Sequence, residues 1–131
     1  IVGQVINVTD NYCAVMSVLH KDFKVSVRFK KNDFFGNMHW NGINSTTANL
    51  EDIPTHVPVK VGDTIVTSGF SQLFPRNILA GTVKSIKMDP DKNFLGITVN
   101  LSTNFENLSN VYIVNNIRKE ELETLDSLTA K

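Results

Sequence analysis

The residues that could do chemistry in this chain are few and widely separated. The histidines are His20, His39 and His56, and no two of them have the H-x-x-x-H or H-E-x-x-H spacing of a metal-binding helix. Because a metal site needs several converging ligands, this spacing predicts no metal site. The single cysteine, Cys13, excludes an internal disulfide and any multi-cysteine site. We expect no metal and no other cofactor.

A nucleophile is equally hard to place. Ser68 precedes Gly69, but the G-x-S-x-G elbow of serine hydrolases is absent, and no histidine and aspartate are spaced for a relay. We therefore expect Ser68 to be a turn residue that bonds nearby backbone. Cys13 lies in an apolar, strand-like run, which favours a buried small hydrophobe over a reactive thiol. The chain also lacks a glycine-rich phosphate loop, so we expect no catalytic residues and no enzymatic activity.

Composition limits the partners. The 131 residues include thirteen acidic and thirteen basic side chains, so there is no overall field to hold a polyanion. Hydrophobic residues make up 41% and charged residues 20%, which is ordinary for a globular protein. No apolar run approaches the roughly 20 residues that span a bilayer. The chain starts at Ile1, inside a strand-like run and without a methionine, so we expect a piece of a longer protein.

Short apolar runs separated by turn residues predict an all-β fold. The clearest alternation is in residues 23–30, where Phe23, Val25, Val27 and Phe29 share one face. Residues 43–56 are polar and aperiodic, which is typical of a boundary between two modules. Residues 118–131 could form only a short helix, which is marginal by itself, so we expect a frayed tail. The expected strands are residues 1–8, 12–19, 23–30, 34–40, 64–67, 78–83, 83–88, 94–101 and 111–114.

Residues 57–83 contain the strongest turn signals. Gly62 and Asp63 predict a tight turn, because glycine takes positive φ freely and the carboxylate accepts a backbone N–H. Gly69 ends the following strand, Pro75 fixes a second corner, and Gly81 inside the next strand suggests a bulge or a close backbone approach. Asn77 is suited to the left-handed region at that second corner. We expect structural roles for Gly62, Asp63, Gly69, Pro75 and Gly81.

The same segment has the pattern V-x-V-G-D-x-V-V-T-S-G, followed by F-P and a V-G-x-V strand. It resembles the signature of the bacterial rod shape-determining MreC family, as do Gly3-Gln4-Val5, Trp40-Asn41-Gly42 and Ile53-Pro54, over roughly residues 1–115. Asn77 departs from the glycine that is usual after Phe-Pro, and Leu79-Ala80 replace a proline-hydrophobic pair. The fitting residues are Val59, Val61, Gly62, Asp63, Val66, Thr67, Ser68, Gly69, Phe74, Pro75, Gly81 and Val83.

The resemblance implies two small six-stranded β-barrels in tandem, over residues 1–52 and 53–117, with a short C-terminal tail over 118–131. It also implies a parent with a short cytoplasmic N-terminus, one inner-membrane span and a coiled coil before Ile1, so that this region is periplasmic. The implied function is that of a non-enzymatic scaffold for cell elongation and lateral peptidoglycan synthesis. The implied partners are a penicillin-binding transpeptidase, MreD, MreB through the membrane, and further copies of the parent.

With no catalytic cluster, function must depend on exposed surface. Aromatic residues beside a turn are harder to bury than those in mid-strand, so they either cap a barrel end or form a patch for a partner. The first set of expected contact residues is Phe34, Phe35, Met38 and Trp40, and the second is Phe70, Leu73 and Phe74.

The alternative is a nucleic-acid-binding barrel of the oligonucleotide-binding type. Such barrels place aromatic and basic side chains on one strand face, for base stacking and phosphate contact. Here Phe23 and Phe29 alternate with the basic side chains and fall on the opposite face. We therefore expect a core face and a solvated face, and no nucleic-acid partner. The basic residues concerned are Lys21, Lys24, Arg28, Lys30 and Lys31.

Overall fold

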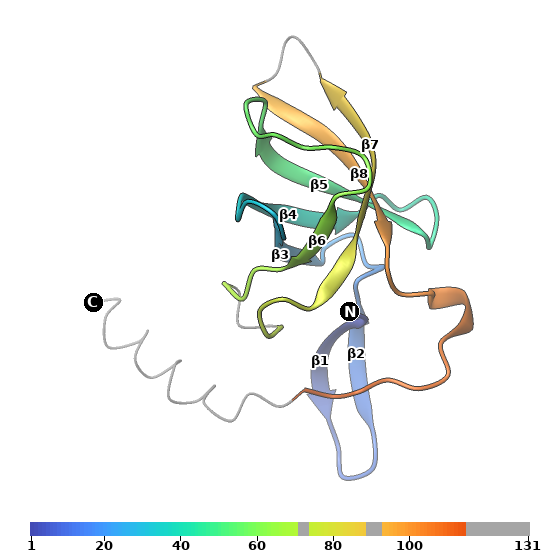
Figure 1. Cartoon of the computed structure of the whole chain (residues 1–131). Helices are drawn as coiled ribbons and strands as arrows, with labels where there is room; N and C mark the ends of the chain where they lie inside the picture. Colours follow the sequence, from blue (N-terminus) through green and yellow to red (C-terminus); the bar gives the residue numbers. More distant parts are fainter. Residues whose placement is uncertain (71–73, 89–92, 115–131) are drawn as a thin grey trace.

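The computed structural model describes residues 1–70, 74–88 and 93–114. These residues form eight strands and one short 3-10 helix, coloured along the chain in Figure 1. The elements are β1 (Gly3–Val8), β2 (Cys13–Ser17), β3 (Lys24–Phe29), β4 (Phe35–Trp40), β5 (Thr47–Pro54), β6 (Thr64–Thr67), β7 (Leu79–Met88), β8 (Phe94–Leu101) and η1 (Phe105–Asn107).

Six antiparallel strands close into a barrel in the order β3-β4-β5-β8-β7-β6, with β6 pairing back to β3. β1 and β2 form a separate two-stranded sheet, which projects away from one end of the barrel (Figure 1). The all-β prediction is therefore confirmed. The finer prediction of two six-stranded barrels in tandem is not, because the described residues form one closed barrel and a hairpin.

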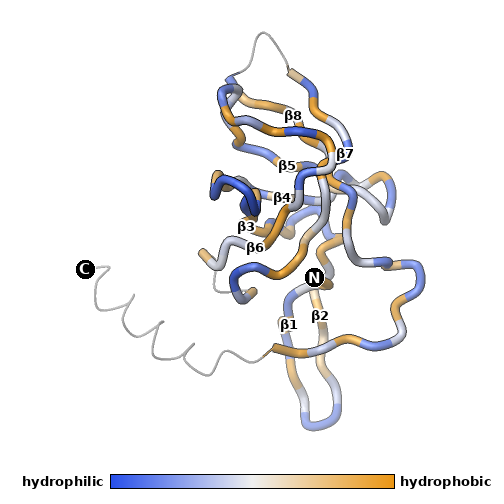
Figure 2. Tube along the Cα trace, viewed as in Figure 1, coloured by the Kyte–Doolittle hydropathy of each residue, from blue (hydrophilic) through white to orange (hydrophobic). Residues whose placement is uncertain are grey.

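The barrel interior is filled by side chains at alternate positions along the barrel strands. Val25, Val27 and Phe29 of β3 are buried, as the alternation in residues 23–30 predicts. On β8, Leu95, Ile97 and Val99 are likewise buried, as expected for residues 94–101. Figure 2 shows the resulting change between hydrophobic and hydrophilic residues along the barrel strands. Where one face of a strand is buried and the other meets solvent, alternation of apolar and polar residues is a reliable sequence signal of that strand.

The predicted module boundary between residues 52 and 53 falls inside β5. Strands on both sides of it, β3 to β5 and β6 to β8, belong to the same barrel. The sequence around the boundary lacks period 2 because β5 has an irregularity between Leu50 and Ile53, where Asp52 takes a φ of 69°. A β-bulge adds one residue to a strand and shifts every later side chain to the other face. The alternation is then broken, and the sequence of β5 resembles that of a linker.

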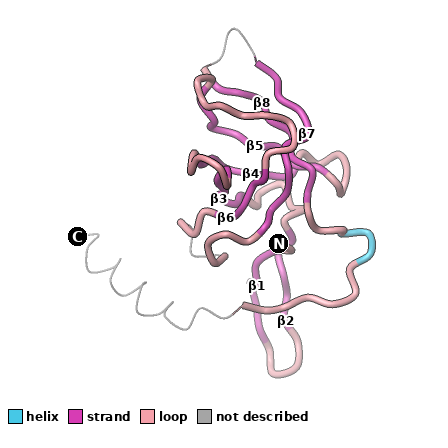
Figure 3. Tube along the Cα trace, in the orientation of Figure 1, coloured by secondary structure: helices cyan, strands magenta, loops and turns pink. Residues whose placement is uncertain are grey.

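Two other strand predictions are corrected. The segments 78–83 and 83–88 form one ten-residue strand, β7. Residues 111–114 are not a strand but part of the exposed loop that follows η1 (Figure 3). Their apolar, β-branched composition favours a strand, but no neighbouring strand among the described residues pairs with them. The predicted tail at 118–131 lies outside the described residues.

The β1–β2 hairpin also differs from expectation. Both faces of residues 12–19 are apolar, which predicts cover on both sides, yet Val8, Tyr12 and Val15 are exposed. Cys13, expected to be buried, is exposed as well. The reason is positional, because the hairpin stands away from the barrel (Figure 1). No helix within residues 1–70, 74–88 and 93–114 has the length and apolar character needed to cross a membrane.

Candidate partner-binding surface

The fold brings together two phenylalanines that are 35 positions apart in the sequence. The ring centroids of Phe35 and Phe70 are 5.2 Å apart, with an edge-to-face angle of 76°. Phe35 begins β4 and Phe70 follows β6, and both strands pair with β3, so the two residues meet beside it. The side chains are 57% and 68% exposed. Two aromatic rings that stack in water present a large apolar area to a partner.

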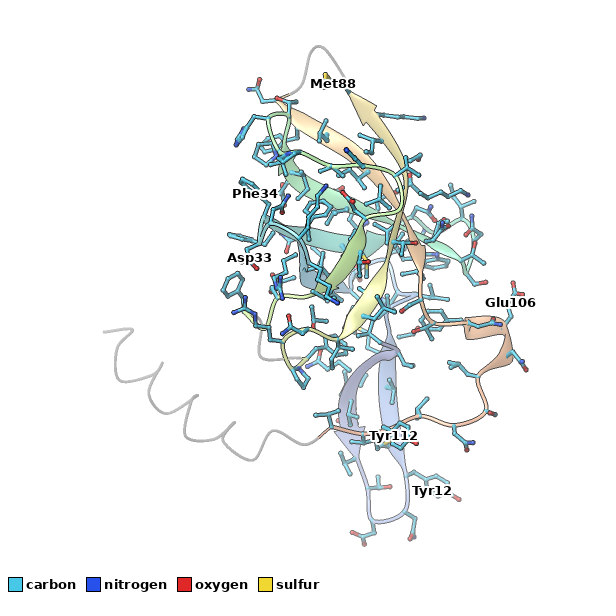
Figure 4. All side chains as sticks on the ribbon, in the orientation of Figure 1. Tyr12, Asp33, Phe34, Met88, Glu106 and Tyr112 are labelled. Carbon is cyan, nitrogen blue, oxygen red and sulfur yellow. The ribbon has the colours of Figure 1, made fainter. Side chains whose placement is uncertain are left out.

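Phe34 extends this surface. It lies in the turn between β3 and β4, next to Asp33 (Figure 4), and is 38% exposed. Its ring packs edge-to-face against the imidazole of His56, with centroids 6.0 Å apart. We call Phe34, Phe35 and Phe70 the aromatic surface. It combines one residue pair from the first expected set with one residue from the second.

The remaining expected contact residues behave differently. Met38 is 1% exposed and faces the barrel interior, so its expected role as a contact residue is corrected. It alternates with Asn37 and His39, which lie on the outer face of β4. Phe74 is partly buried and packs edge-to-face on Phe23 at 6.5 Å, which places it against the core. Leu73 lies outside the described residues.

Trp40 is tied to the loop between β4 and β5. Its indole Nε1 donates a hydrogen bond to the backbone oxygen of Asn44 at 2.6 Å. The side chain of Asn44 in turn accepts from the backbone N–H groups of Thr46 and Thr47, both at 3.0 Å. Trp40 is half-buried. Its position therefore supports the loop between β4 and β5.

The turn at Gly62 and Asp63 forms as predicted. Gly62 has a φ of 94°, and its N–H donates to the oxygen of Val83 at 2.8 Å. The Asp63 carboxylate accepts from the Lys60 N–H and from Lys31 Nζ, each at 2.7 Å. Burial by itself would raise the pKa of Asp63, but these hydrogen bonds and lysine charges outweigh it and hold the pKa below its usual value.

The second corner also matches its signals. Gly69 has a φ of 82° and Asn77 a φ of 72°, so Asn77 adopts the left-handed conformation expected of it. The carbonyl of Pro75 accepts the Thr67 hydroxyl proton. A Cβ on Gly81 would lie 2.1 Å from the oxygen of Asn100, which confirms the close backbone approach.

Ser68 has the turn role predicted for it. Its side-chain oxygen accepts from the Phe70 N–H at 3.2 Å, and its hydroxyl lies 2.7 Å from Ser26 Oγ. The residue is 4% exposed. No group of three or more histidine, cysteine, aspartate or glutamate side chains that could hold a metal ion occurs among the described residues.

Two of the five basic residues are held in ion pairs. Arg28 pairs with Asp33, and Lys31 pairs with Asp63, each at 2.7 Å. Phe23 and Phe29 are buried, so they cannot stack on bases.

Cross-strand contacts are the features that sequence reasoning missed. Phe35–Phe70 and the His39–Glu51 pair at 2.6 Å each join two elements, and no local spacing announces either contact. Only the strand register brings these side chains together.

The family model described as "Rod shape-determining protein MreC, barrel core" matches residues 1–115. The chain belongs to the MreC family. The resemblance in the signature segment is therefore confirmed, over the same length of chain. A curated relative, the cell shape-determining protein MreC of Escherichia coli K12, is 28% identical over 94 residues. That match covers 72% of this chain but 25% of the relative, so the chain spans about a quarter of its length.

Solved structures share the fold. MreC from Pseudomonas aeruginosa superposes with a TM-score of 0.72 at 24% identity, covering 77% of this chain and 64% of that one. MreC in a complex with the penicillin-binding protein PBP2, from Helicobacter pylori, gives a TM-score of 0.62 at 19% identity, covering 75% and 59%. The major periplasmic domain from the cell shape-determining filament MreC gives 0.61 at 20% identity, covering 78% and 64%.

Proposed function

We propose that this chain is the extracytoplasmic β region of a non-enzymatic scaffold, which determines cell shape by binding a penicillin-binding transpeptidase of cell elongation. Membership of the MreC family supports the cell-shape role. The Helicobacter pylori neighbour is a complex with PBP2, which supports a penicillin-binding protein as the class of partner. Through that partner the scaffold would organise lateral peptidoglycan synthesis.

The observation that carries the proposal is the exposed Phe35–Phe70 pair. Interfaces concentrate their binding free energy in a few large side chains, and aromatic residues are enriched among these. Phe35 and Phe70 are two exposed aromatic rings in contact with each other, and a protein partner would cover the apolar area that they present. Phe34 would belong to the same surface, whereas Phe74 packs against the core and Trp40, at the other end of β4, orders the β4–β5 loop.

The position in the cell follows from the same family. A parent anchored in the inner membrane would hold this region in the periplasm, as the solved periplasmic domain of an MreC supports. Further partners would be MreD, MreB through the membrane, and other copies of the parent. A tandem arrangement of barrels would require strands beyond the single barrel of the described residues.

The test is a calorimetric titration of the chain with the soluble transpeptidase domain from the same organism. We expect saturable binding near one to one. Phe35→Ala and Phe70→Ala should each weaken binding by about 2 kcal/mol, as truncation of an interface hot spot does. Tyr12→Ala is the control, because Tyr12 is an aromatic residue that is 81% exposed and lies at the far end of the hairpin (Figure 4).

Absence of binding by the wild-type chain would contradict the proposal. The nucleic-acid alternative is tested alongside by fluorescence titration with single-stranded DNA at low and moderate salt. Binding to phosphates releases counterions, so it must weaken steeply as salt rises. DNA binding with that salt dependence, and no transpeptidase binding, would favour the alternative.

A further inference from the structure

Arg28 lies on the outer face of the barrel, yet its side chain is almost fully enclosed. Its neighbours Val27 and Phe29 face the core, so alternation directs Arg28 outward. Even so, its side chain is only 10% exposed. In the sheet it pairs with Phe35 of β4 and with Val66 of β6. Arg28 therefore lies between the strand that begins at Phe35 and the strand that leads to Phe70.

The guanidinium connects two turns that are far apart in the sequence. Nη1 donates to Asp33 Oδ1 at 2.7 Å, and Nη2 donates to the side-chain oxygen of Asn77. Asp33 and Asn77 have φ values of 61° and 72°. Aspartate and asparagine are among the residues that tolerate this conformation best after glycine, and here both side chains also accept from Arg28. The Arg28 side chain thus bonds to two turns, each of which contains a residue with a positive φ.

Each of these turns supports one ring of the aromatic surface. Asp33 lies two residues before Phe35, in the turn that leads into β4. On the other side, the backbone of Arg76 is packed against Gly69, where an added Cβ would lie 3.1 Å from the Cβ of Arg76. Gly69 directly precedes Phe70. The Asn77 turn therefore supports the residue that carries the second ring.

From this geometry we infer that Arg28 is a positioning residue for the aromatic surface. By holding the Asp33 and Asn77 turns, it keeps Phe35 against Phe70 before a partner arrives. This role rests on the proposed function of that surface. A surface ordered in advance loses less conformational entropy on binding, so its affinity is higher for the same contacts.

The informative variant is Arg28→Met. Among the described residues, the buried Nε of Arg28 has no hydrogen-bond partner, so one donor of the guanidinium is left without an acceptor. Removing one partner of an ion pair is strongly destabilising when the other charge is left buried, which is not the case here. Asp33 is 70% exposed and returns to water. The barrel should therefore stay folded while the Arg28 link between the turns is lost, which leaves the longer Arg76–Asp33 ion pair at 3.5 Å.

Two further variants complete the set. Arg28→Lys keeps the charge, but a single ammonium cannot reach two acceptors in the fixed fork of a guanidinium, so it should behave like Arg28→Met. Lys24→Met is the matched control, because Lys24 lies on the same face of β3 and is exposed. It changes the charge equally and leaves both turns intact.

The first readout uses the free chain. Nuclear Overhauser effects between the rings of Phe35 and Phe70, with backbone order parameters at residues 33–35 and 76–78, report the order of the surface. In Arg28→Met the ring contacts should disappear and order parameters should fall toward about 0.6, the flexible range. Lys24→Met should match the wild type. Unchanged ring contacts in a folded Arg28→Met would overturn the inference.

Should Arg28→Met fail to fold, Asp33→Gly makes the same test. Glycine keeps the tolerance of positive φ and removes the oxygen that accepts from Arg28 Nη1, so the ring contacts should weaken, and unchanged contacts would again overturn the inference. The second readout is affinity for the transpeptidase domain, which should fall about tenfold in Arg28→Met, or 1.4 kcal/mol. Absence of binding by the wild type contradicts the proposed function, whereas the ring contacts still decide the role of Arg28.

Discussion

Trp40 donates a hydrogen bond from its indole Nε1 to the backbone oxygen of Asn44, and 2.6 Å separate the two atoms. The bond crosses the loop between β4 and β5, where the Asn44 side chain already accepts two backbone N–H groups. Trp40, the largest aromatic residue expected to bind a partner, thus makes its hydrogen bond within its own chain. A tryptophan beside a turn can order that turn as well as meet a partner.

Trp40→Ala should therefore act on stability. Because Trp40 is half-buried and loses both packing and a hydrogen bond, we expect the free energy of unfolding to fall by about 2 kcal/mol. Trp40→Phe, which keeps the ring and removes the donor, should cost about 1 kcal/mol. Urea denaturation measures both. An unchanged denaturation midpoint together with a loss of transpeptidase affinity would instead assign Trp40 to the contact surface.

His39 on β4 and Glu51 on β5 form a hydrogen-bonded pair, with 2.6 Å between Nε2 and Oε1. The hydrogen bond that His39 donates to the Glu51 carboxylate raises the pKa of His39 above its usual value, although partial burial and the charge of Lys24 on β3 oppose the shift. A raised pKa in the folded state means that protonation stabilises the fold. That contribution is complete below the unfolded-state pKa of about 6.5 and is lost as pH rises through the higher folded-state pKa.

We therefore expect stability to decrease slightly as pH rises above about 6.5. Because Glu51 is 49% exposed, solvent screening keeps the effect below about 1 kcal/mol. Thermal unfolding across this range, with the His39 titration followed by NMR, measures both quantities. Glu51→Gln should lower the pKa of His39 and flatten the stability profile. A profile with the same slope in the variant would show that another group is responsible.

Gly81 and Gly96 provide a matched pair of glycines in β7 and β8. A Cβ on Gly81 would lie 2.1 Å from the oxygen of Asn100, whereas the nearest heavy atom to a Cβ on Gly96 is 3.7 Å away. Gly81→Ala should therefore destabilise the barrel by about 2 kcal/mol or more, because the strands must separate. Gly96→Ala should change stability by less than about 0.5 kcal/mol. Equal effects in denaturant titrations would mean that β7 and β8 pack less closely.

The sequence predicted those elements whose environment is regular. β3 and β8 each have one buried face, so their alternation gave their bounds and their core residues. β5 was not predicted because its bulge at Asp52 breaks the alternation that identifies strands. The turn residues Gly62, Gly69 and Asn77 were predictable because a positive φ restricts residue type.

The candidate site was predicted only in part. Phe35 and Phe70 could be chosen as aromatic residues beside turns, but their contact depends on both strands pairing with β3. Arg28 was read as part of a solvated basic face, because nothing local indicates that the Asn77 turn covers it. Long-range register is the information that a single sequence does not supply.

The position of Cys13 is the sharpest difference from expectation, and its chemistry makes it easy to test. An apolar run predicts a buried thiol, but Cys13 lies exposed on a hairpin that stands away from the barrel. We expect it to react with a thiol reagent such as dithionitrobenzoate in the native state, at a rate within about tenfold of that in denaturant, since accessibility governs reactivity. The control carries Cys13→Ser and Val18→Cys, because position 18 is 1% exposed and its thiol should react slowly until the fold opens.

Slow reaction of native Cys13 would mean that the hairpin is covered in solution. Repeating the measurement at lower protein concentration would show whether a second copy covers it, since only that cover is lost on dilution.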